Sequence, residues 1–355
     1  MEILPQDIQI EILEYLNFKD LIKMKKINKY FNNLIKQNKW KYTTISFKYN
    51  APNLYIINLL RTHNFVNYDF FNIKFTNTGL QFLSNCQKLD LTCCKIPNTG
   101  LKYLLNCKIL NLTKTNITDE SLQYLSNSKN LITCGKLFLD SCNITDEGLK
   151  YLSNIHNISL YKCNITDKGL KYLTNCKKLT LCETNITDEG LQFLQNCKEL
   201  NLYQTNITDK GLKYLTNCKS LNLHRCKITD ESLQFLKNCR KIDLCDCKIT
   251  NEGLRFLTNC NKIDLSWCNI TDEGLQYLKN CEILNLGFCN ITGQGLKYLI
   301  NCKILNLSFS KITDQSLEFL LNCKDLKLCN IIIKACNISE QMINELRNKG
   351  IKVYI

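Results

Sequence analysis

Long apolar runs are missing from this sequence, and so are the usual signs of export. No stretch approaches the ~20 consecutive apolar residues that a transmembrane helix needs. The N-terminus, MEILPQDIQIEILEYL, has acidic residues where a signal peptide has basic ones, and it lacks a continuous apolar core. These absences predict a soluble protein of the cytoplasm or nucleus with no membrane partner.

Motifs for cofactors and metals are also missing. The sequence contains no Gly-rich phosphate loop and no zinc-finger spacing. Only three histidines occur in 355 residues, and two of them, His63 and His156, are isolated. The sequence therefore predicts no cofactor and no metal site.

Lysine and cysteine are abundant, and each has a simple interpretation. The net charge is +14, but the lysines are spread along the chain without a long run, as on a solvated surface. In a short secreted chain 23 cysteines would indicate disulfides, whereas here most occupy two fixed positions of a long repeat. We expect free thiols in a reducing compartment.

A 21-residue repeat organises most of the chain. The phrase NITDEGLQYLxNC recurs with small changes. The interval is 21 residues, except for 27 between Ile117 and Ile144 and 26 between Ile312 and Ile338. The thirteen residues that mark the phase are Phe75, Ile96, Ile117, Ile144, Ile165, Ile186, Ile207, Ile228, Ile249, Ile270, Ile291, Ile312 and Ile338.

One unit shows how the repeat should fold. Leu179-x-Leu181 predicts a short strand with a two-residue period. Thr187 or Asp188 is expected to cap a helix, and Asn196 is expected to end it in the left-handed conformation. The apolar positions of this helix are Leu191, Phe193 and Leu194.

Three positions of the repeat accept small side chains. The first position suits a weak hydrogen-bond donor that bonds nearby backbone, and the second suits a small buried hydrophobic side chain. The third position suits a glycine or serine where neighbouring repeats approach closely. The first holds Cys94, Thr115, Cys142, Cys163, Thr184, Thr205, Cys226, Cys247, Cys268, Cys289, Ser310 and Cys336. The second holds Cys86, Cys107, Cys176, Cys197, Cys218, Cys239, Cys260, Cys281, Cys302 and Cys323. The third holds Gly79, Gly100, Ser121, Gly148, Gly169, Gly190, Gly211, Ser232, Gly253, Gly274, Gly295 and Ser316.

This pattern resembles the leucine-rich repeat, L-x-x-L-x-L-x-x-N/C-x-L, and in particular the cysteine-containing subclass found behind F-boxes. The resemblance covers about residues 66–340. The unit here is shorter than that subclass leads us to expect, so the segments opposite the strands should be short. The resemblance implies an α/β solenoid, a horseshoe of about thirteen units.

The N-terminal 45 residues do not follow the repeat but show apolar residues at helical spacing. Their order and spacing resemble an F-box, although Phe31 stands where that family usually has tryptophan. The residues that carry the resemblance are Leu4, Pro5, Ile8, Ile12, Leu13, Leu16, Asp20, Leu21, Ile27, Phe31, Leu34 and Trp40. The resemblance implies a three-helix F-box over 1–45.

An F-box followed by leucine-rich repeats implies a partner and a role. In this family the F-box docks on a Skp-family adaptor, which joins a cullin scaffold, and the repeats hold a target protein. The residues carried over to the adaptor surface are Leu4, Pro5, Ile8, Ile12, Leu13 and Leu16. Some of them must instead form the F-box core, and the sequence does not separate the two groups. The implied role is a non-catalytic substrate-recognition subunit of an SCF-type ubiquitin ligase.

The remaining boundaries follow from the repeat. Residues 46–66, with a helical stretch at 53–60, are interpreted as a connector and degenerate first repeat. The repeats proper occupy 67–340, and 341–355 should form a C-terminal cap, because a repeat array needs its ends covered.

The short strands should line a concave face, and their outward residues should form three columns on it. They run from Asp90 to Lys327, from Thr92 to Cys329 and from Cys93 to Phe309. Most members are small and polar, but one stretch carries large rings, which are typical anchors of interfaces. Alternatively, these rings pack on the ascending loop. The residues predicted to bind a target are Tyr203, His224, Arg225, Asp246, Trp267, Phe288 and Phe309.

His224, Cys245 and Asp246 form a Cys-His-Asp set on neighbouring repeats. Two flat strands offer no oxyanion hole, and nothing marks the thiol as activated. No catalytic residue is therefore predicted.

Two other functions fit parts of the sequence. The chain could sequester the Skp-family adaptor as a decoy or scaffold without any ubiquitin transfer. A basic solenoid could also bind nucleic acid, but Asp90, Asp140, Asp243 and Asp264 in the columns argue against a nucleic-acid partner. The Asn-, Lys- and Ile-rich composition indicates an AT-rich genome, such as that of an amoeba or a large virus of amoebae.

Overall fold

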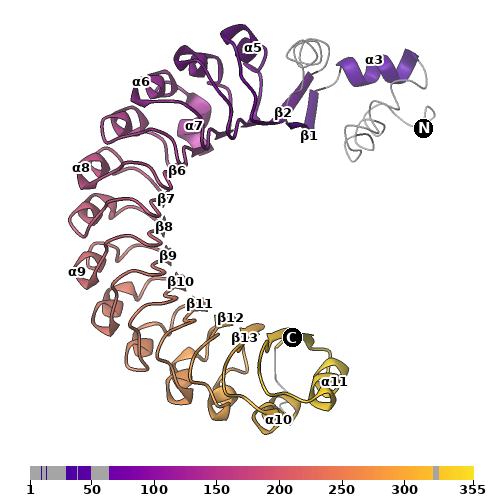
Figure 1. Cartoon of the computed structure of the whole chain (residues 1–355), viewed down its shortest axis with the longest axis vertical. Helices are drawn as coiled ribbons and strands as arrows, with labels where there is room; N and C mark the ends of the chain where they lie inside the picture. The colour runs from indigo at the N-terminus through magenta and orange to yellow at the C-terminus, as the bar shows by residue number, and fades with distance from the viewer. Residues whose placement is uncertain (1–8, 10–12, 14–28, 38, 49–63, 323–327) are drawn as a thin grey trace. The chain divides into compact units, whose positions relative to one another are not determined.

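The computed structural model describes residues 9, 13, 29–37, 39–48, 64–322 and 328–355. The chain divides into two units, Met1–Ile165 and Thr166–Ile355. Within each unit, parallel strands follow one another in chain order. The strands lie on one side of each unit, and short helical segments lie on the other (Figure 1). The predicted α/β solenoid is therefore confirmed.

Successive strands of the first unit pair in parallel, and an extra helix, α7, fills the 27-residue repeat. The strands are β1 (Lys39–Lys48), β2 (Asn64–Phe71), β3 (Lys88–Asp90), β4 (Ile109–Asn111), β5 (Lys136–Phe138) and β6 (Asn157–Ser159). The α-helices and 3-10 helices (η) are α3 (Lys29–Gln37), α5 (Asn77–Gln81), η1 (Asn98–Tyr103), α6 (Asp119–Leu122), η2 (Gln123–Leu125), α7 (Lys129–Cys134) and η3 (Gly148–Leu152).

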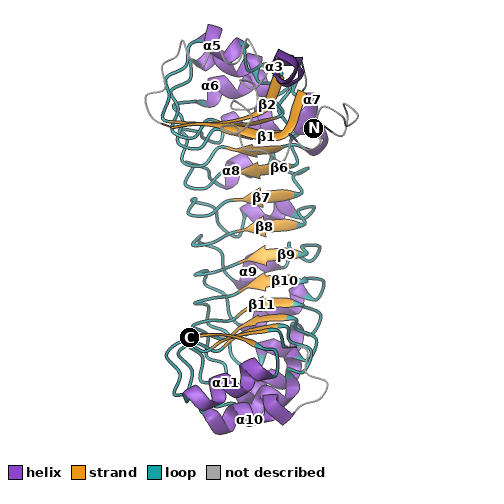
Figure 2. Ribbon diagram, turned by 90° about the vertical axis from the view of Figure 1, so that its right-hand side faces the viewer, coloured by secondary structure: helices purple, strands orange, loops and turns teal. Residues whose placement is uncertain are grey.

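The second unit continues the same pattern, and Figure 2 shows its short strands one beside the next. Its strands are β7 (Lys178–Thr180), β8 (Glu199–Asn201), β9 (Ser220–Asn222), β10 (Lys241–Asp243), β11 (Lys262–Asp264), β12 (Ile283–Asn285), β13 (Ile304–Asn306), β14 (Asn330–Ile332) and β15 (Lys352–Tyr354). Its helical segments are α8 (Asp167–Leu170), η4 (Gly190–Leu194), α9 (Asp209–Leu212), η5 (Asp230–Leu236), η6 (Gly253–Phe256), η7 (Asp272–Leu278), η8 (Gln294–Tyr298), α10 (Asp314–Asn322) and α11 (Glu340–Asn348).

Leucine and isoleucine side chains at fixed repeat positions form the core. In the repeat that contains β7, Leu179, Leu181, Ile186 and Leu191 are all buried. Burying one such side chain stabilises the fold by roughly 1.5–3 kcal/mol relative to leaving it exposed. Phe193, which was predicted to belong to this core, is only half-buried. The 21-residue period thus converts a local pattern into a continuous apolar layer within each unit.

The Gly/Ser position confirms that neighbouring repeats approach closely. A Cβ atom added at Gly190 would lie 2.4 Å from Oδ1 of Asp167 and 2.8 Å from Cδ1 of Leu170. Serine fits where its hydroxyl can bond across the same gap. Ser232 Oγ donates to Oδ1 of Asp209 at 2.6 Å. Most segments opposite the strands are only one or two turns long, as the short repeat predicted.

The Thr-Asp pair of each ITD phrase mainly joins repeats, so the prediction that it caps a helix is wrong for the unit described above. Helix η4 begins after Glu189, and no side-chain cap bond forms there. Instead the backbone N–H and hydroxyl of Thr187 donate to the carboxylate of Asp167, at 2.8 and 2.6 Å. The same Thr–Asp link recurs between most consecutive repeats.

Asn196 does not adopt the left-handed conformation that was predicted for it, since it is absent from the residues with positive φ in the described chain. Its side-chain amide instead donates to the carbonyl oxygen of Thr174 in the preceding repeat, at 3.4 Å. Equivalent asparagines make the same bond along the second unit. This asparagine column is therefore a second link between repeats.

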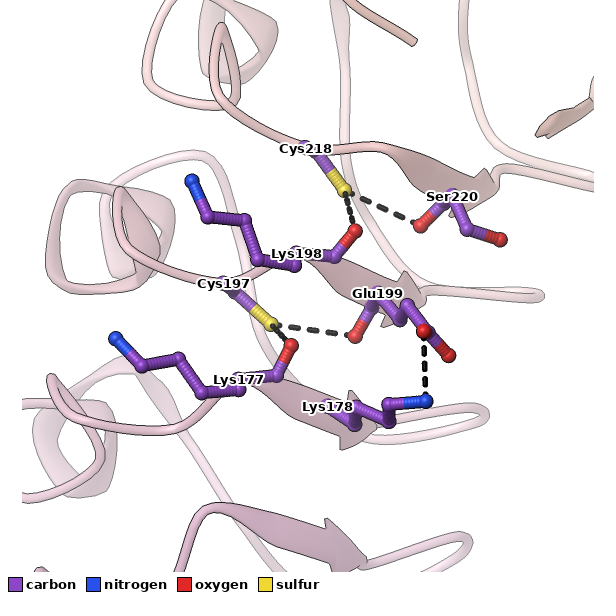
Figure 3. Close-up of polar contacts among 7 residues, drawn as sticks. All are labelled: Lys177, Lys178, Cys197, Lys198, Glu199, Cys218 and Ser220. Atoms are coloured by element: carbon purple, nitrogen blue, oxygen red, sulfur yellow. Dashed lines mark hydrogen bonds and ion pairs between the residues drawn. The ribbon is translucent and has the colours of Figure 1, made fainter. Parts of the chain in front are cut away.

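Both cysteine columns donate weak hydrogen bonds to backbone carbonyls, although only the first column was predicted to do so. In the second column, Cys197 Sγ lies 3.4 Å from the carbonyl oxygen of Lys177 and 3.2 Å from that of Glu199 (Figure 3). In the first column, Cys226 Sγ lies 3.1 Å from the carbonyl oxygen of Leu202. No disulfide joins any two of the described cysteines.

At the N-terminal end, the described segments are α3 and β1. Leu34 and Ile35 of α3 are buried, in agreement with the predicted helical stripe. Strand β1 begins within the predicted F-box range and pairs with β2, where the rings of Phe47 and Phe70 stack 5.1 Å apart. The predicted connector helix at 53–60 lies outside the described residues.

The C-terminal residues extend the sheet, because β15 pairs in parallel with β14. Helix α11 buries Met342, Ile343 and Leu346 against this end. The register also corrects two column assignments. Asn306 pairs with Ile332, so Ile332 and Lys334 continue the first two columns in place of the predicted Lys327 and Cys329.

Candidate functional site

A tight turn follows each short strand. It fixes the backbone conformation of one residue within the turn. In β11, Asp264 Oδ1 accepts hydrogen bonds from the backbone N–H of Ser266 at 2.9 Å and from its hydroxyl at 2.5 Å. The next residue, Trp267, then has a φ of 63°. The third predicted column therefore lies in this turn and not on the strand itself. Its left-handed members are Asn72, Cys93, Lys114, Ser141, Lys162, Glu183, Gln204, Arg225, Asp246, Trp267, Phe288, Phe309 and Ala335.

Three aromatic rings occupy consecutive members of this turn column. The ring centroids of Trp267 and Phe288 are 4.0 Å apart, and those of Phe288 and Phe309 are 4.2 Å apart, with interplanar angles of 14° and 10°. The three residues are 59%, 40% and 45% exposed. The alternative in which these rings pack on the ascending loop is therefore not what the structure shows. We call these three residues the aromatic stack.

The backbone at the aromatic stack is strained. A positive φ is uncommon for any residue other than glycine, and for a bulky residue it is an outlier that costs roughly 1–2 kcal/mol. The same left-handed turn recurs along the described repeats, so the rings and not the strain distinguish this surface. Large exposed rings at a position where the backbone disfavours them, over three repeats in a row, mark this surface as the leading candidate for recognition.

The other residues predicted to bind a target lie on the repeats just before the stack. Arg225 Nε lies 3.2 Å from Asp246 Oδ2, an exposed ion pair in the turn column itself. The rings of Tyr203 and His224 meet edge to face, with centroids 4.9 Å apart. The predicted set thus lies on consecutive repeats of the second unit.

The Cys-His-Asp set shows no sign of activation. Burial raises the pKa of the Cys245 thiol, which favours the unreactive protonated form. The carboxylate of Asp246 is engaged by Arg225, and the ring of His224 packs on Tyr203. Among the residues that the structure describes, no group of three or more His, Cys, Asp or Glu side chains could hold a metal ion.

Of the six residues carried over to the adaptor surface, only Leu13 is among those described. Its side chain is fully buried. Nearby, the hydroxyl of Tyr30 donates to Oε1 of Gln9 at 3.0 Å. The five residues that lie outside the described part are Leu4, Pro5, Ile8, Ile12 and Leu16.

Comparisons with known proteins agree with this architecture. The family model of the F-box domain matches residues 1–43. The family model of the leucine-rich repeat matches residues 87–105, 108–126, 136–153, 261–279 and 282–299. A comparison with curated protein sequences finds no match.

Solved structures share the fold. An internalin from Listeria monocytogenes is 22% identical, with a TM-score of 0.59 over 78% of this chain and 82% of the internalin. A leucine-rich-repeat protein from Leptospira interrogans is 18% identical, with a TM-score of 0.60 over 96% of this chain and 94% of that protein. At these identities the likeness extends to the fold alone.

An F-box domain followed by leucine-rich repeats matches the architecture of F-box/leucine-rich-repeat proteins, and this architecture supports a protein-interaction adaptor. Proteins of this class are generally non-catalytic interaction modules. In the part of the chain that the structure describes, no helix is long and apolar enough to cross a bilayer.

Proposed function

We propose that this protein is the substrate-recognition subunit of an SCF-type cullin ubiquitin ligase. The F-box docks on a Skp-family adaptor that joins a cullin scaffold, and the repeats hold a target protein. The observation that carries the proposal is the F-box match at residues 1–43 followed by leucine-rich repeats. The protein then works inside the cell, in the cytoplasm or nucleus.

The proposed contribution to ubiquitin transfer is proximity and not chemistry. Holding a target lysine beside the charged conjugating enzyme converts a bimolecular reaction into an effectively intramolecular one. A rigid support favours this role, and the described repeats are joined by Thr–Asp links, asparagine bonds and cysteine bonds. No catalytic residue, metal or cofactor is part of the proposal.

The proposed target site comprises the aromatic stack with its polar neighbours. Large rings contribute most of the energy in many interfaces, whereas small polar side chains lose hydration with little apolar gain. The members of the site are Tyr203, His224, Arg225, Asp246, Trp267, Phe288 and Phe309. Trp267→Ala should weaken target binding by about 2 kcal/mol or more, without changing adaptor binding.

A second function uses the same two surfaces without ubiquitin transfer. A decoy or scaffold would bind the Skp-family adaptor, or other partners through its repeats, and keep them from a ligase. The two functions differ in one outcome, namely whether proteins held by the repeats become ubiquitinated.

The test is affinity purification of the full chain with mass spectrometry, followed by reconstituted ubiquitination of the proteins that co-purify. We expect recovery of the Skp-family adaptor and the cullin. The double variant Leu4→Ala with Pro5→Ala should lose both, while Lys198→Ala, an exposed change in the repeats, should lose neither. Recovery of the adaptor by the double variant would remove the basis for the ligase proposal, and recovery without ubiquitination would favour the decoy.

A further inference from the structure

We propose that the aromatic stack binds an extended, acidic segment of a target protein and receives one aromatic side chain of that segment beside Phe309. This inference rests on the proposed function, because it names the chemistry of the target. It is carried by the ring geometry, by a gap at Ala335 and by the charges around the stack.

The stack presents ring edges along most of its length. Phe288 has Trp267 on one face at 4.0 Å and Phe309 on the other at 4.2 Å, so its exposed surface is its edge. Ring edges carry partial positive charge and favour the face of another ring or an oxygen atom. An extended backbone with carbonyl and carboxylate oxygens meets that requirement along the strip.

The end of the stack at Phe309 leaves room for one more ring. Phe309 N–H donates to the carbonyl oxygen of Lys334 at 2.9 Å, which places Ala335 at the next position of the turn column. Ala335 is exposed and has only a methyl group where the three preceding repeats have rings. A planar side chain of the target can lie above this methyl group and continue the stack at its regular spacing.

The charges beside the stack favour an acidic partner. Lys248, Lys311 and Lys334 are exposed and lie within two residues of turn-column positions. Of the two nearby carboxylates, one forms an ion pair, and the other is half-buried and accepts hydrogen bonds from neutral groups. Asp246 pairs with Arg225, and Asp264 accepts from Ser266 and, through Oδ2, from Asn285 at 2.7 Å. The exposed charges near the stack that no described ion pair neutralises are therefore those of the lysines, whereas Asp264 keeps a half-buried negative charge.

A nucleic acid fits this surface less well than a protein segment. Stacking of successive bases needs several open ring faces, whereas the inner faces of this stack are already paired. The observations therefore favour a peptide, and nucleic acid becomes an outcome of the test.

The experiment selects ligands from a displayed library of random 12-residue peptides against the full-length chain. The counter-selection uses the variant Trp267→Ser, Phe288→Ser, Phe309→Ser, first shown by circular dichroism and urea unfolding to be folded. We expect a consensus with one aromatic residue among Asp and Glu, enriched on the natural chain alone. No enrichment over the variant, or a basic consensus, would overturn the proposal, and so would tight binding of an oligonucleotide that displaces the selected peptide.

Two further variants test the proposed details with the selected peptide. Ala335→Phe extends the stack into the gap and should weaken binding at least 10-fold, whereas Ala335→Ser should change it less than 3-fold. Lys311→Glu with Lys334→Glu should also weaken it at least 10-fold while leaving the rings in place. If neither variant weakens binding, the assigned partner chemistry is wrong. Skp-family adaptor recovery measured on the same variants tests the ligase proposal separately, because the peptide experiment needs no adaptor.

Discussion

The carboxylate of Asp230 accepts two hydrogen bonds from Thr250 of the following repeat, one from the backbone N–H at 2.9 Å and one from the hydroxyl at 2.5 Å. The chain contains a natural comparison for this link. Where Asn251 stands in the place of the aspartate, its Oδ1 accepts from Thr271 N–H at 3.0 Å and its Nδ2 donates to the Thr271 hydroxyl at 2.7 Å. An uncharged asparagine can therefore make the same link to the threonine of the following repeat.

Asp230→Ala should lower the free energy of unfolding by about 1–3 kcal/mol, because it leaves a partly buried N–H and hydroxyl without an acceptor. Asp230→Asn should cost clearly less, since the amide can make the bonds seen at Asn251. Urea unfolding followed by circular dichroism measures both values. Equal losses for the two variants would contradict the role assigned to this link.

The Thr–Asp link between Thr292 and Asp272 should depend on pH. Burial by itself would raise the pKa of its carboxyl, but hydrogen bonds from the backbone of Gly295 and Thr292, from the Thr292 hydroxyl and from Gly293 N–H outweigh burial and lower the pKa. A carboxyl whose pKa is lower in the folded state adds stability above the pKa of the unfolded chain, near ~4, and loses it as the pH falls through the folded pKa.

Asp272→Asn should therefore destabilise the protein at pH 6–7, and its difference from the natural chain should shrink as the pH falls below about 4. Glu273→Gln, a neighbouring change at an exposed position, should show no such trend. Urea unfolding at pH 7, 5 and 3 provides the comparison. A difference that stays constant with pH would mean that the charge of Asp272 does not contribute.

Gly190→Leu should destabilise the fold by several kcal/mol, because the added side chain would overlap Asp167 and Leu170, and overpacking alone costs ~1–3 kcal/mol. Gly190→Ser should cost less than Gly190→Ala, since a hydroxyl can donate to Asp167 as Ser232 does to Asp209. Lys198→Ala, at an exposed site, should cost less than about 0.5 kcal/mol. Differential scanning calorimetry would show the order, and similar melting temperatures for Gly190→Leu and Lys198→Ala would refute the close contact.

The thiols should all be free but mostly unreactive in the native protein. Burial raises the pKa of Cys163 and Cys268 to about 12, so very little thiolate exists at pH 8. Cys329 is exposed, and Cys93 and Cys336 are partly exposed, so these three should react first. Mass spectrometry after iodoacetamide should show few labels on the native chain and 23 on the chain unfolded without reductant. Fewer than 23 labels would indicate disulfides.

The sequence predicted the core and the two cysteine positions well, because burial at these positions depends on spacing within one repeat. Leu179, Leu181 and Ile186 are buried as their period indicated. Contacts between repeats were harder to predict. A Thr-Asp pair before an apolar segment is typical of a helix cap, and Thr166 does cap α8, but only the position of the next repeat shows that the carboxylate of Asp167 bonds Thr187.

The candidate site was predicted in part. Its aromatic residues were identifiable from their spacing, but their left-handed backbone was not, because the turn column contains almost no Gly or Asn to signal it. The polar residue that ends each strand, such as Asp264, imposes the turn through its bond to the N–H two residues later. These strand-end polar residues were visible in the sequence, but they were interpreted only as an outward-facing column and not as the residues that impose the turn.

The backbone strain at the aromatic stack yields a prediction that separates function from stability. At Trp267, with a φ of 63°, glycine avoids the clash of a Cβ atom with the backbone, which costs roughly 1–2 kcal/mol in the left-handed region. Glycine also loses more chain entropy on folding, by roughly 0.5–1 kcal/mol relative to alanine. Trp267→Gly should therefore be more stable than Trp267→Ala, by about 0.5–1 kcal/mol, although both lack the ring and both should lose target binding.

The matched control is Lys213, an exposed residue in the right-handed region with a φ of −56°. There the order should reverse, with Lys213→Gly less stable than Lys213→Ala. Urea unfolding of the four variants gives both differences under one set of conditions. If alanine is the more stable replacement at both positions, the left-handed turn is not strained, and the argument that the rings are kept there for recognition loses its energetic basis.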